Sequence, residues 1–521
     1  MAKKREGLAV LPGLFLLTVL SGIFLQRLSG IESVSQWMFL LTLLTLCVLV
    51  VYWSKDGKMT EDRWIALLFL AAFAARLCYT GTITIRQNQH DVRYFNYPKA
   101  NYGHTGYIEY LLENKHLPDF DVRGKFQFYH PPLHHILCAL WLKVQEACGI
   151  VFAEAAENLQ LLTLFYSMVA LYASDRIFRL VGLRGKPRVF AFLLVAFHPT
   201  WFLLSGSINN DCLSVALVFC AVWAVLEWHR SHKWYVIVAL AFCIGGSMAS
   251  KLATGVVAPA VALLFLYDLI KEKGAANKGK LVAQFALFGV ICIPLGIGWQ
   301  ARNYLQYGVP LTYVPKLADN IDQYLGNYTV PQRLFDFRSL VDFGVFPSRT
   351  GTQGAEYFEH CIPLAALKTA LFGEYSTWRD SGFFRLLGTV LFGVNGVVVL
   401  GAVASMFASG FDLLKACVRR ETRAFSARWN TGRAPFALLG CYWVTMMISY
   451  VLFCFEYPHF CSMDYRYIVP TMLVGAVFFG KLLERLERSE ARAARNVSAV
   501  LTTCVATFAV CSTCLYPLYF G

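Results

Sequence analysis

The stretch WYVIVALAFCIGGSMAS, residues 234–250, decides the fold of this chain. It contains no charged side chain, and Lys251 follows it directly. Similar apolar runs recur from one end of the chain to the other, and a run of about 17 to 25 apolar residues can cross the hydrocarbon core of a bilayer. Because that core offers no water to the backbone, a crossing segment must be helical. The sequence therefore predicts an all-α, polytopic membrane protein.

The composition agrees with a membrane protein and argues against a nucleic-acid-binding one. Of the 521 residues, 57% are hydrophobic and 15% are charged. The formal net charge is +14, but Lys and Arg are spread over short loops between apolar runs. This distribution is the orientation signal of a membrane protein, so no nucleic-acid partner is predicted.

Fourteen apolar runs are candidate spans, beginning near residues 8, 36, 64, 132, 161, 189, 210, 234, 253, 281, 386, 435, 467 and 497. Basic clusters follow the second, fifth, seventh, ninth, eleventh and thirteenth runs. All of them lie in the cytoplasm, together with a basic, retained N-terminal anchor, only if one early run does not cross. We expect that run to be 132–144, which begins at a double proline and contains histidines, and to lie at the membrane interface. The expected bundle has about 13 transmembrane helices.

This topology divides the chain into five parts. They are three N-terminal spans in 1–80, a large first external loop with interfacial helices in 81–158, a core transmembrane module in 159–300, a second external loop in 301–382, and C-terminal spans in 383–521. Several short polar motifs then fall at the outer surface. We therefore expect the chemistry to take place on the external face.

The first external loop opens with QHDVRY, residues 89–94. A carboxylate near the membrane can take a proton from an attacking hydroxyl, and a partly apolar site can raise its pKa toward the working pH. Asp91 is therefore the candidate catalytic base, with His90 and Arg93 beside it. The alternative is an interfacial Asp91 that only forms an ion pair with Arg86 or Arg93.

Two further motifs contribute candidate supporting residues. In YHPPL, residues 129–133, the prolines fix the entry angle of a helix, and His130 and Glu109 are candidates within the same loop. Asn210 and Asp211 follow an outer turn. They either cap the next helix, since Asn and Asp satisfy free N–H groups, or form a structural hydrogen bond to the Asp91 loop. For the YHPPL stretch, the alternative is a helix start and nothing more.

Three cations occupy the outer ends of separate spans: Lys251, Arg302 and Arg466. A single cation there usually extends to the interface or forms an ion pair. Three of them, on the face that should hold the fewest, indicate an anionic ligand. A lipid-linked phosphate fits, and Arg offers bidentate geometry for it. Tyr465 and Tyr467 flank Arg466 as further candidates.

A metal site is only weakly indicated. Asp119 and Asp121 form a D-x-D sequence, and His134 and His135 lie nearby, but these histidines match no standard ligand spacing. No metal ligand is assigned and no cofactor is expected, with a divalent metal kept as an alternative.

These elements, in this order, resemble the GT-C superfamily of polyprenyl-phosphate-sugar-dependent glycosyltransferases. The branches most similar to it are the protein mannosyltransferases (glycosyltransferase family 39) and the bacterial aminoarabinose and lipopolysaccharide-core transferases. The resemblance rests on the following positions: Asp91, residues 130–133, Asn210-Asp211, Lys251 with Thr254, Arg302-Asn303, and Arg466-Tyr467. It implies a GT-C-like helical bundle and an inverting transfer with Asp91 as the base. The implied donor is a polyprenyl-phosphate sugar, and the phosphate-binding residues are Lys251, Arg302 and Arg466.

The sequence therefore predicts an integral membrane glycosyltransferase that uses an external lipid, glycan or protein as acceptor. It predicts a multi-pass protein of the cell membrane, or of the endoplasmic reticulum membrane in a eukaryote. One alternative is a transporter or flippase of a lipid-linked glycan, which should place charges near the bilayer midplane and show a repeated half. Another is a non-catalytic lipid-binding protein, which would tolerate loss of Asp91. The sequence names neither the sugar nor the acceptor.

Overall fold

The computed structural model describes residues 2–26, 31–85, 94–96, 103–321, 323–341, 359–373, 382–419, 422–430 and 432–520. Helices dominate this part of the chain. Its β pairing is a single antiparallel bridge between Tyr324 and His459. The predicted all-α class is confirmed.

The helices of the N-terminal half are α1 (Ala2–Gln26), α2 (Ile31–Lys55), α3 (Glu61–Thr82), α4 (Gly103–Asn114), η1 (Val122–Gly124), α5 (Leu133–Ala147), α6 (Phe152–Glu157), α7 (Gln160–Leu180), α8 (Gly185–Ala196), α9 (Pro199–Gly206), α10 (Asp211–Ser231) and α11 (Trp234–Ser250). The helices of the C-terminal half are η2 (Leu252–Val257), α12 (Ala258–Lys271), α13 (Ala275–Tyr307), α14 (Val330–Phe335), η3 (Arg338–Val341), α15 (Ile362–Phe372), α16 (Gly382–Val418), α17 (Thr422–Trp429), α18 (Arg433–Glu456), η4 (Phe460–Met463), η5 (Tyr465–Tyr467), α19 (Pro470–Glu487), α20 (Arg492–Leu515) and η6 (Tyr516–Phe520).

The predicted spans coincide with helices. In the described part, 9 helical segments are long and apolar enough to cross a membrane, or 10 if the bent pair α8 and α9 is one span. The apolar part of α1 and all of α11 are shorter, and α19 carries charged residues in its second half. Each of the roughly 13 expected spans thus corresponds to a helix or to the bent pair. The protein is a multi-pass membrane protein.

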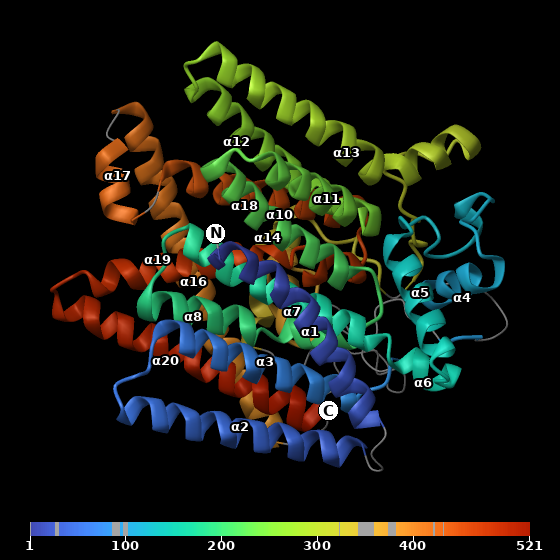
Figure 1. Ribbon diagram of the computed structural model, residues 1–521, viewed down its shortest axis with the longest axis horizontal. Coiled ribbons are helices and arrows are strands. Elements are labelled where there is room, and N and C mark those ends of the chain that lie inside the picture. The colour runs from blue at the N-terminus through green and yellow to red at the C-terminus, as the bar shows by residue number, and fades with distance from the viewer. Residues whose placement is uncertain are drawn as a thin grey trace.

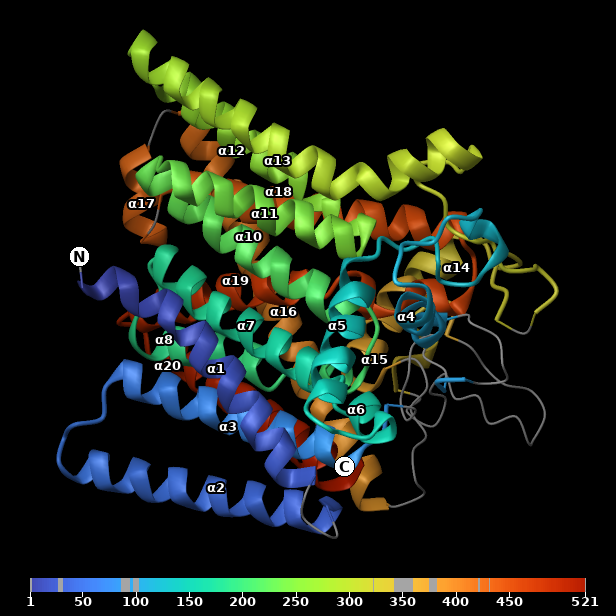
Figure 2. The same cartoon turned by 45° about the vertical axis from the view of Figure 1, so that its right-hand side comes forward.

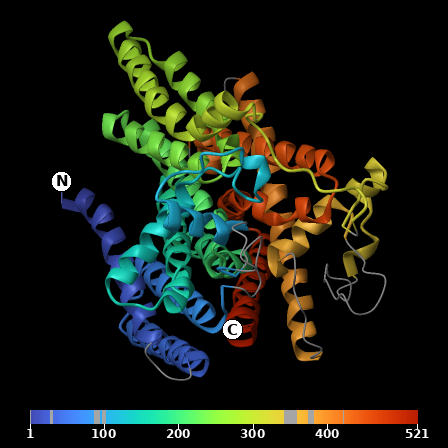
Figure 3. The ribbon, with the colours of Figure 1, turned by 90° about the vertical axis from the view of Figure 1, so that its right-hand side faces the viewer.

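The long helices run side by side, and the two ends of the bundle differ (Figure 1). The N-terminus and α17 lie at one end, whereas α4, α5, α6 and α14 lie at the other, as Figure 2 shows. The expected interfacial segment after Pro132 forms α5, which packs against α4 and α6 at this end. We call it the α4–α6 end. Figure 3 views the bundle from it, with the first loop beside the chain that leaves α13.

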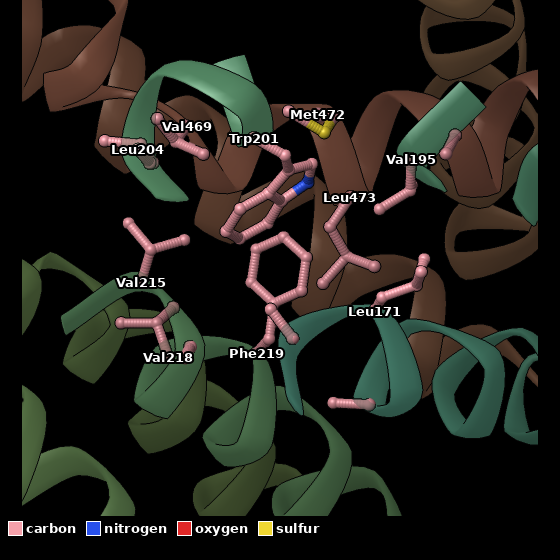
Figure 4. Close-up of a cluster of buried hydrophobic side chains, with 14 of the residues drawn as sticks. Leu171, Val195, Trp201, Leu204, Val215, Val218, Phe219, Val469, Met472 and Leu473 are labelled. Carbon is pink, nitrogen blue, oxygen red and sulfur yellow. The ribbon is translucent and has the colours of Figure 1, made fainter. Parts of the chain in front are cut away.

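A tightly packed core of buried side chains joins α7, α8, α9, α10 and α19. Trp201 of α9 packs edge-on against Phe219 of α10, with ring centroids 5.6 Å apart, and side chains of α7, α8 and α19 surround them (Figure 4). Pro199 occupies the first turn of α9, where its missing N–H costs nothing. The break between α8 and α9 exposes carbonyls at the end of α8, and the guanidinium of Arg76 donates to one of them, the Ala196 oxygen, at 2.8 Å. The core therefore fixes where α10 begins.

Candidate functional site

A cavity of about 370 Å³ lies at the α4–α6 end. Its walls come from the first loop, the start of α10, the break between α11 and η2, the end of α13 with the chain after it, α18, and η5. The predicted site residues that line it are His130, Asn210, Asp211, Lys251, Arg466 and Tyr467. The fold thus brings four distant segments of the sequence to one place.

The turn before α10 presents Asp211 to the cavity. The Asp211 backbone N–H donates to the side-chain oxygen of Asn209 at 3.1 Å, so Asn209 provides the cap. Asn210 instead donates its side-chain amide to the carbonyl of Ser250 at 2.7 Å. This bond ties the start of α10 to the end of α11. Asn210 is the N-cap residue of α10 but makes no capping hydrogen bond with its side chain, and a bond from it to the Asp91 loop stays a prediction.

Lys251 sits where α11 stops and η2 starts. Its backbone is extended, and its carbonyl accepts a hydrogen bond from Thr254 Oγ1 at 2.8 Å. This short turn directs the Lys251 ammonium at Asp211, with which it forms an ion pair. The same ammonium lies 4.6 Å from the ring centroid of Tyr467, within the range of a cation–π interaction.

Arg466 approaches the same carboxylate from the opposite wall. The side chain of Asp464 accepts the Arg466 backbone N–H at 2.9 Å and so fixes the turn of η5. Arg466 Nη1 lies 3.8 Å from Asp211 Oδ2, and its Nη2 donates to the Tyr467 hydroxyl at 3.2 Å. Asp211 therefore stands between two cations.

The charge on the cavity wall is unbalanced. Among the described residues that line the cavity, Lys251 and Arg466 are cationic and Asp211 is the one carboxylate. Asp464 lies 3.7 Å from Arg466 Nε but does not line the cavity. The wall therefore carries a net positive charge in a site where burial strengthens electrostatic interactions. An anion is the ligand that such a wall favours.

Two histidines of the first loop, His104 and His130, complete the polar wall. Burial holds the pKa of His104 well below its usual value, and the neighbouring His130 adds to that effect. Burial likewise lowers the pKa of His130, and Lys251 is the next largest cause. Both imidazoles are therefore neutral at pH 7. His104 was not predicted, because no motif distinguished it from the other histidines of the loop.

The other wall of the cavity is apolar and was also missed. One face of α18 supplies it, through Tyr442, Met446, Ser449, Tyr450 and Phe453. These positions follow the helical spacing of one face, but α18 is apolar all round, so the sequence does not show which face meets a cavity.

Two predicted residues lie near the cavity without lining it. Arg302 donates to the side chain of its neighbour Asn303 at 2.8 Å and lies 5.1 Å from the Trp299 ring centroid. Asn303 itself lines the cavity. Tyr465 points elsewhere, because its hydroxyl is 3.1 Å from Thr471 Oγ1.

Glu109 belongs to a different pocket, of about 340 Å³, between α4, α5 and α6. Burial raises its pKa, although the backbone N–H of Asn96 donates to its carboxylate. The structure therefore does not join Glu109 to the cations. His90, Asp91 and Arg93 lie outside the described residues.

A metal site finds no support from the donor groups that the structure describes. Among these residues, no three His, Cys, Asp or Glu side chains are grouped so that they could hold a metal ion. In the D-x-D sequence, Asp121 pairs with Arg123 at 2.6 Å, and Asp119 accepts a bond from the Tyr110 hydroxyl at 3.3 Å.

These features are those of a multi-pass membrane protein with a cavity suited to an anion at one end of the bundle. Residues 129–297, less than half of the chain, match the family model of dolichyl-phosphate-mannose-protein mannosyltransferases. The fold is similar to that of the *Archaeoglobus fulgidus* oligosaccharyltransferase in its apo form, with a TM-score of 0.50 and 15% identity over 88% of this chain and 56% of that one. The chain is therefore similar to glycosyltransferases, in sequence over residues 129–297 and in fold over most of its length.

Two further structures are similar at lower scores. They are of ArnT from *Cupriavidus metallidurans*, one bound to undecaprenyl phosphate and one in the apo state. Their TM-scores are 0.46 and 0.45, with 13% and 12% identity over 88% and 87% of this chain and 77% and 76% of theirs. No curated protein sequence matches the chain significantly.

Proposed function

We propose that this protein is a glycosyltransferase that moves a sugar from a polyprenyl-phosphate donor to an acceptor hydroxyl or amine on an external lipid, glycan or protein. The transfer inverts the anomeric carbon, and Asp91 is the general base. The observation that carries the proposal is the convergence of Lys251 and Arg466 on a cavity whose other wall is apolar.

The two cations match the charge that the reaction develops. A polyprenyl-phosphate sugar is a phosphodiester with one negative charge, and the polyprenyl phosphate that leaves carries up to two. Groups that stabilise the leaving phosphate more than the bound donor accelerate the transfer. Lys251 and Arg466 are held in place by Asp211 before the donor arrives. They can therefore meet this charge without a metal ion, and the proposed mechanism includes none.

The apolar wall suits the other half of the donor. The face of α18 lies beside the cations and continues toward the interior of the bundle. A prenyl chain on this face would place its phosphate next to Lys251 and Arg466. The sugar would then face the first loop, from which His130 and Tyr129 line the cavity.

Asp91 is assigned on sequence grounds. It is the carboxylate of the motif that opens the first loop, and this loop contributes His104, Tyr129 and His130 to the cavity wall. The Asp211 carboxylate is already engaged by two cations, which disfavours it as a proton acceptor.

The test is transfer of radiolabelled sugar from a panel of polyprenyl-phosphate donors by purified protein. We expect Asp91→Asn to lower kcat by about 10²- to 10⁴-fold, the range of general acid–base catalysis. Binding of polyprenyl phosphate should be retained. Asp121→Asn, in the same loop but paired with Arg123 at the surface, is the matched control and should transfer normally.

Two outcomes would contradict the proposal. Normal transfer by Asp91→Asn would show that the base is another residue. Translocation of a lipid-linked glycan by the wild type, with no transfer from any donor, would favour the flippase.

A further inference from the structure

A column of stacked aromatic rings runs from the cavity into the first loop. In order, its rings belong to Tyr129, His130, His104, His135, Tyr107 and Phe128. The successive ring centroids lie 4.1, 5.5, 5.2, 4.2 and 4.5 Å apart. The first three residues line the cavity, and the other three lie behind them. The rings of this column have no chemical role in the transfer proposed above.

The middle of the column is a hydrogen-bonded histidine pair. His104 Nδ1 and His135 Nε2 are 3.0 Å apart, and both side chains are almost completely buried. A hydrogen bond between two imidazole nitrogens needs a proton on one of them and a lone pair on the other. The pair therefore shares one proton, and a second proton arriving at His104 from the cavity would be shared with His135.

Electrostatics keep His104 neutral while the cavity holds no donor, so that it keeps a lone pair. Within the described part of the chain, the titratable or charged groups that face His104 are His130, His134, His135, Lys251 and Arg466. None of them is an anion, and together with burial they hold the pKa of His104 low. A bound phosphodiester adds a negative charge opposite the histidines, and the departing phosphate adds another. The reaction itself therefore makes an imidazolium at His104 more stable.

We propose that His104, backed by His135, takes over from the general base the proton that the acceptor loses during sugar transfer. This inference rests on the proposed function. In the balanced step, the acceptor O–H bond breaks, the oxygen bonds to the anomeric carbon, and the bond from that carbon to the phosphate oxygen breaks. The electron pair of the broken bond stays on the phosphate. The general base takes the acceptor proton and passes it to His104, where the proton stays until it leaves with the polyprenyl phosphate or passes to water.

Other roles for these two histidines can be separated from this one. A structural histidine would affect stability, and a donor-binding histidine would affect the KM for the donor. His134 offers the structural comparison, because it is fully buried on the same helix as His135 and bonds the Ile208 carbonyl at 2.7 Å. His116 offers the surface comparison, because it is exposed in the same loop.

The experiment measures kcat, KM for the donor and the pH dependence of kcat for the wild type and four variants: H104N, H135N, H134N and H116N. We expect H104N to lower kcat by about 10²-fold with little change in KM. The wild-type kcat should rise with pH as the imidazolium of the enzyme–donor complex loses its proton. This rise of kcat with pH should be absent in H104N and should shift to another pH in H135N. It should persist in H134N and H116N.

Chemical rescue gives a readout that a structural role would not produce. His104→Gly leaves room beside the cavity for a free imidazole. Added imidazole should restore transfer, and substituted imidazoles of higher pKa should restore it better at a pH where each is neutral.

The inference is overturned if H104N keeps the wild-type kcat and pH profile, or if its loss lies wholly in KM. Failure of rescue while folded His104→Gly still binds polyprenyl phosphate would also overturn it. If the wild type transfers no sugar from any donor in the panel, the proposed function itself has failed. That result differs from the others because no variant then has an activity to compare.

Discussion

Two clusters of buried charge, at different places in the bundle, use the same residue types with a different balance. Where α3, α7 and α8 meet, Arg188 contacts Asp175 at 2.5 Å and Asp62 at 3.0 Å, and it also pairs with Glu61. Arg179 joins the same cluster through Asp62 and Asp175. Here each cation meets at least two carboxylates. At the cavity, Asp211 lies between Lys251 and Arg466, and Asp464 is a second carboxylate near Arg466, so two described carboxylates meet two cations.

This difference in charge balance separates a structural ion-pair cluster, which links helices, from a ligand-binding site. The cluster around Arg188 satisfies its own charges and links three helices, so no ligand is needed to complete it. Asp464 does not line the cavity, so the described residues that do line it keep a net positive charge, which an anion would balance. Counting ion pairs would treat the two clusters alike, but the balance of charge within each separates them.

The largest expected effect comes from removing the excess charge at the cavity. Lys251→Met or Arg466→Met should each lower kcat/KM for the donor by about 10²- to 10³-fold, the loss seen when one group that stabilises developing charge is removed. The double variant should lose more than either single variant. The measurement is transfer together with binding of polyprenyl phosphate.

Lys143→Met is the matched control for these variants. Lys143 forms an exposed pair with Glu146 in the first loop, at 2.7 Å, and its loss should not alter transfer. If both Lys251→Met and Arg466→Met kept wild-type kinetics for the donor, the excess positive charge at the cavity would not serve donor binding or transfer. The two clusters would then not differ in function.

The next effect is on stability. The side chain of Arg188 is 4% exposed, and Arg188→Leu would leave Asp175, itself 9% exposed, without its closest partner. Breaking a buried ion pair in this way typically lowers the free energy of unfolding by about 3–5 kcal/mol. Thermal unfolding in detergent measures the loss, and the molecules that remain folded should transfer sugar at the wild-type rate. A folded Arg188→Leu protein with impaired chemistry would show that this cluster also serves the site.

The smallest expected effect is on the affinity of the cavity for an anion. Asp211→Asn removes the carboxylate that partly neutralises Lys251 and Arg466. Inorganic phosphate or polyprenyl phosphate should then bind about tenfold more tightly, which corresponds to about 1.4 kcal/mol. Isothermal titration of the purified protein measures this. Weaker binding would instead show that Asp211 acts mainly by holding the two cations in position.

Hydropathy was enough to predict the helical fold, because each apolar run of sufficient length has few alternatives to a helix in a bilayer. The same argument placed Lys251 and Arg466 at the ends of spans, and the structure brings both to one cavity. Arg302, the third predicted cation, does not line the cavity, whereas Gln300 and Asn303 do, and its part in phosphate binding stays a prediction. Successive side chains on a helix point about 100° apart. Knowing on which side of the membrane a residue lies therefore does not tell which face of the helix it occupies.

Two parts of the site were beyond sequence reasoning for a different reason. The wall on α18 and the pairing of His104 with His135 depend on which helix faces meet. In a chain whose helices are apolar on every side, that choice is made by shape complementarity between distant segments. The assignment of Asp91 remains a prediction, because that residue lies outside the described part of the chain.

The cavity also has a consequence for how the protein is made. Its walls are contributed early by His130, midway by Lys251, and only near the end by Tyr442 and Arg466. A ribosome that has delivered the chain as far as α17 has inserted most of the helices, yet the pocket still lacks its apolar wall and one of its two cations. Under the proposed function, the nascent protein therefore has no complete donor site until its last spans enter the membrane, and a prematurely ended chain lacks one of the two cations.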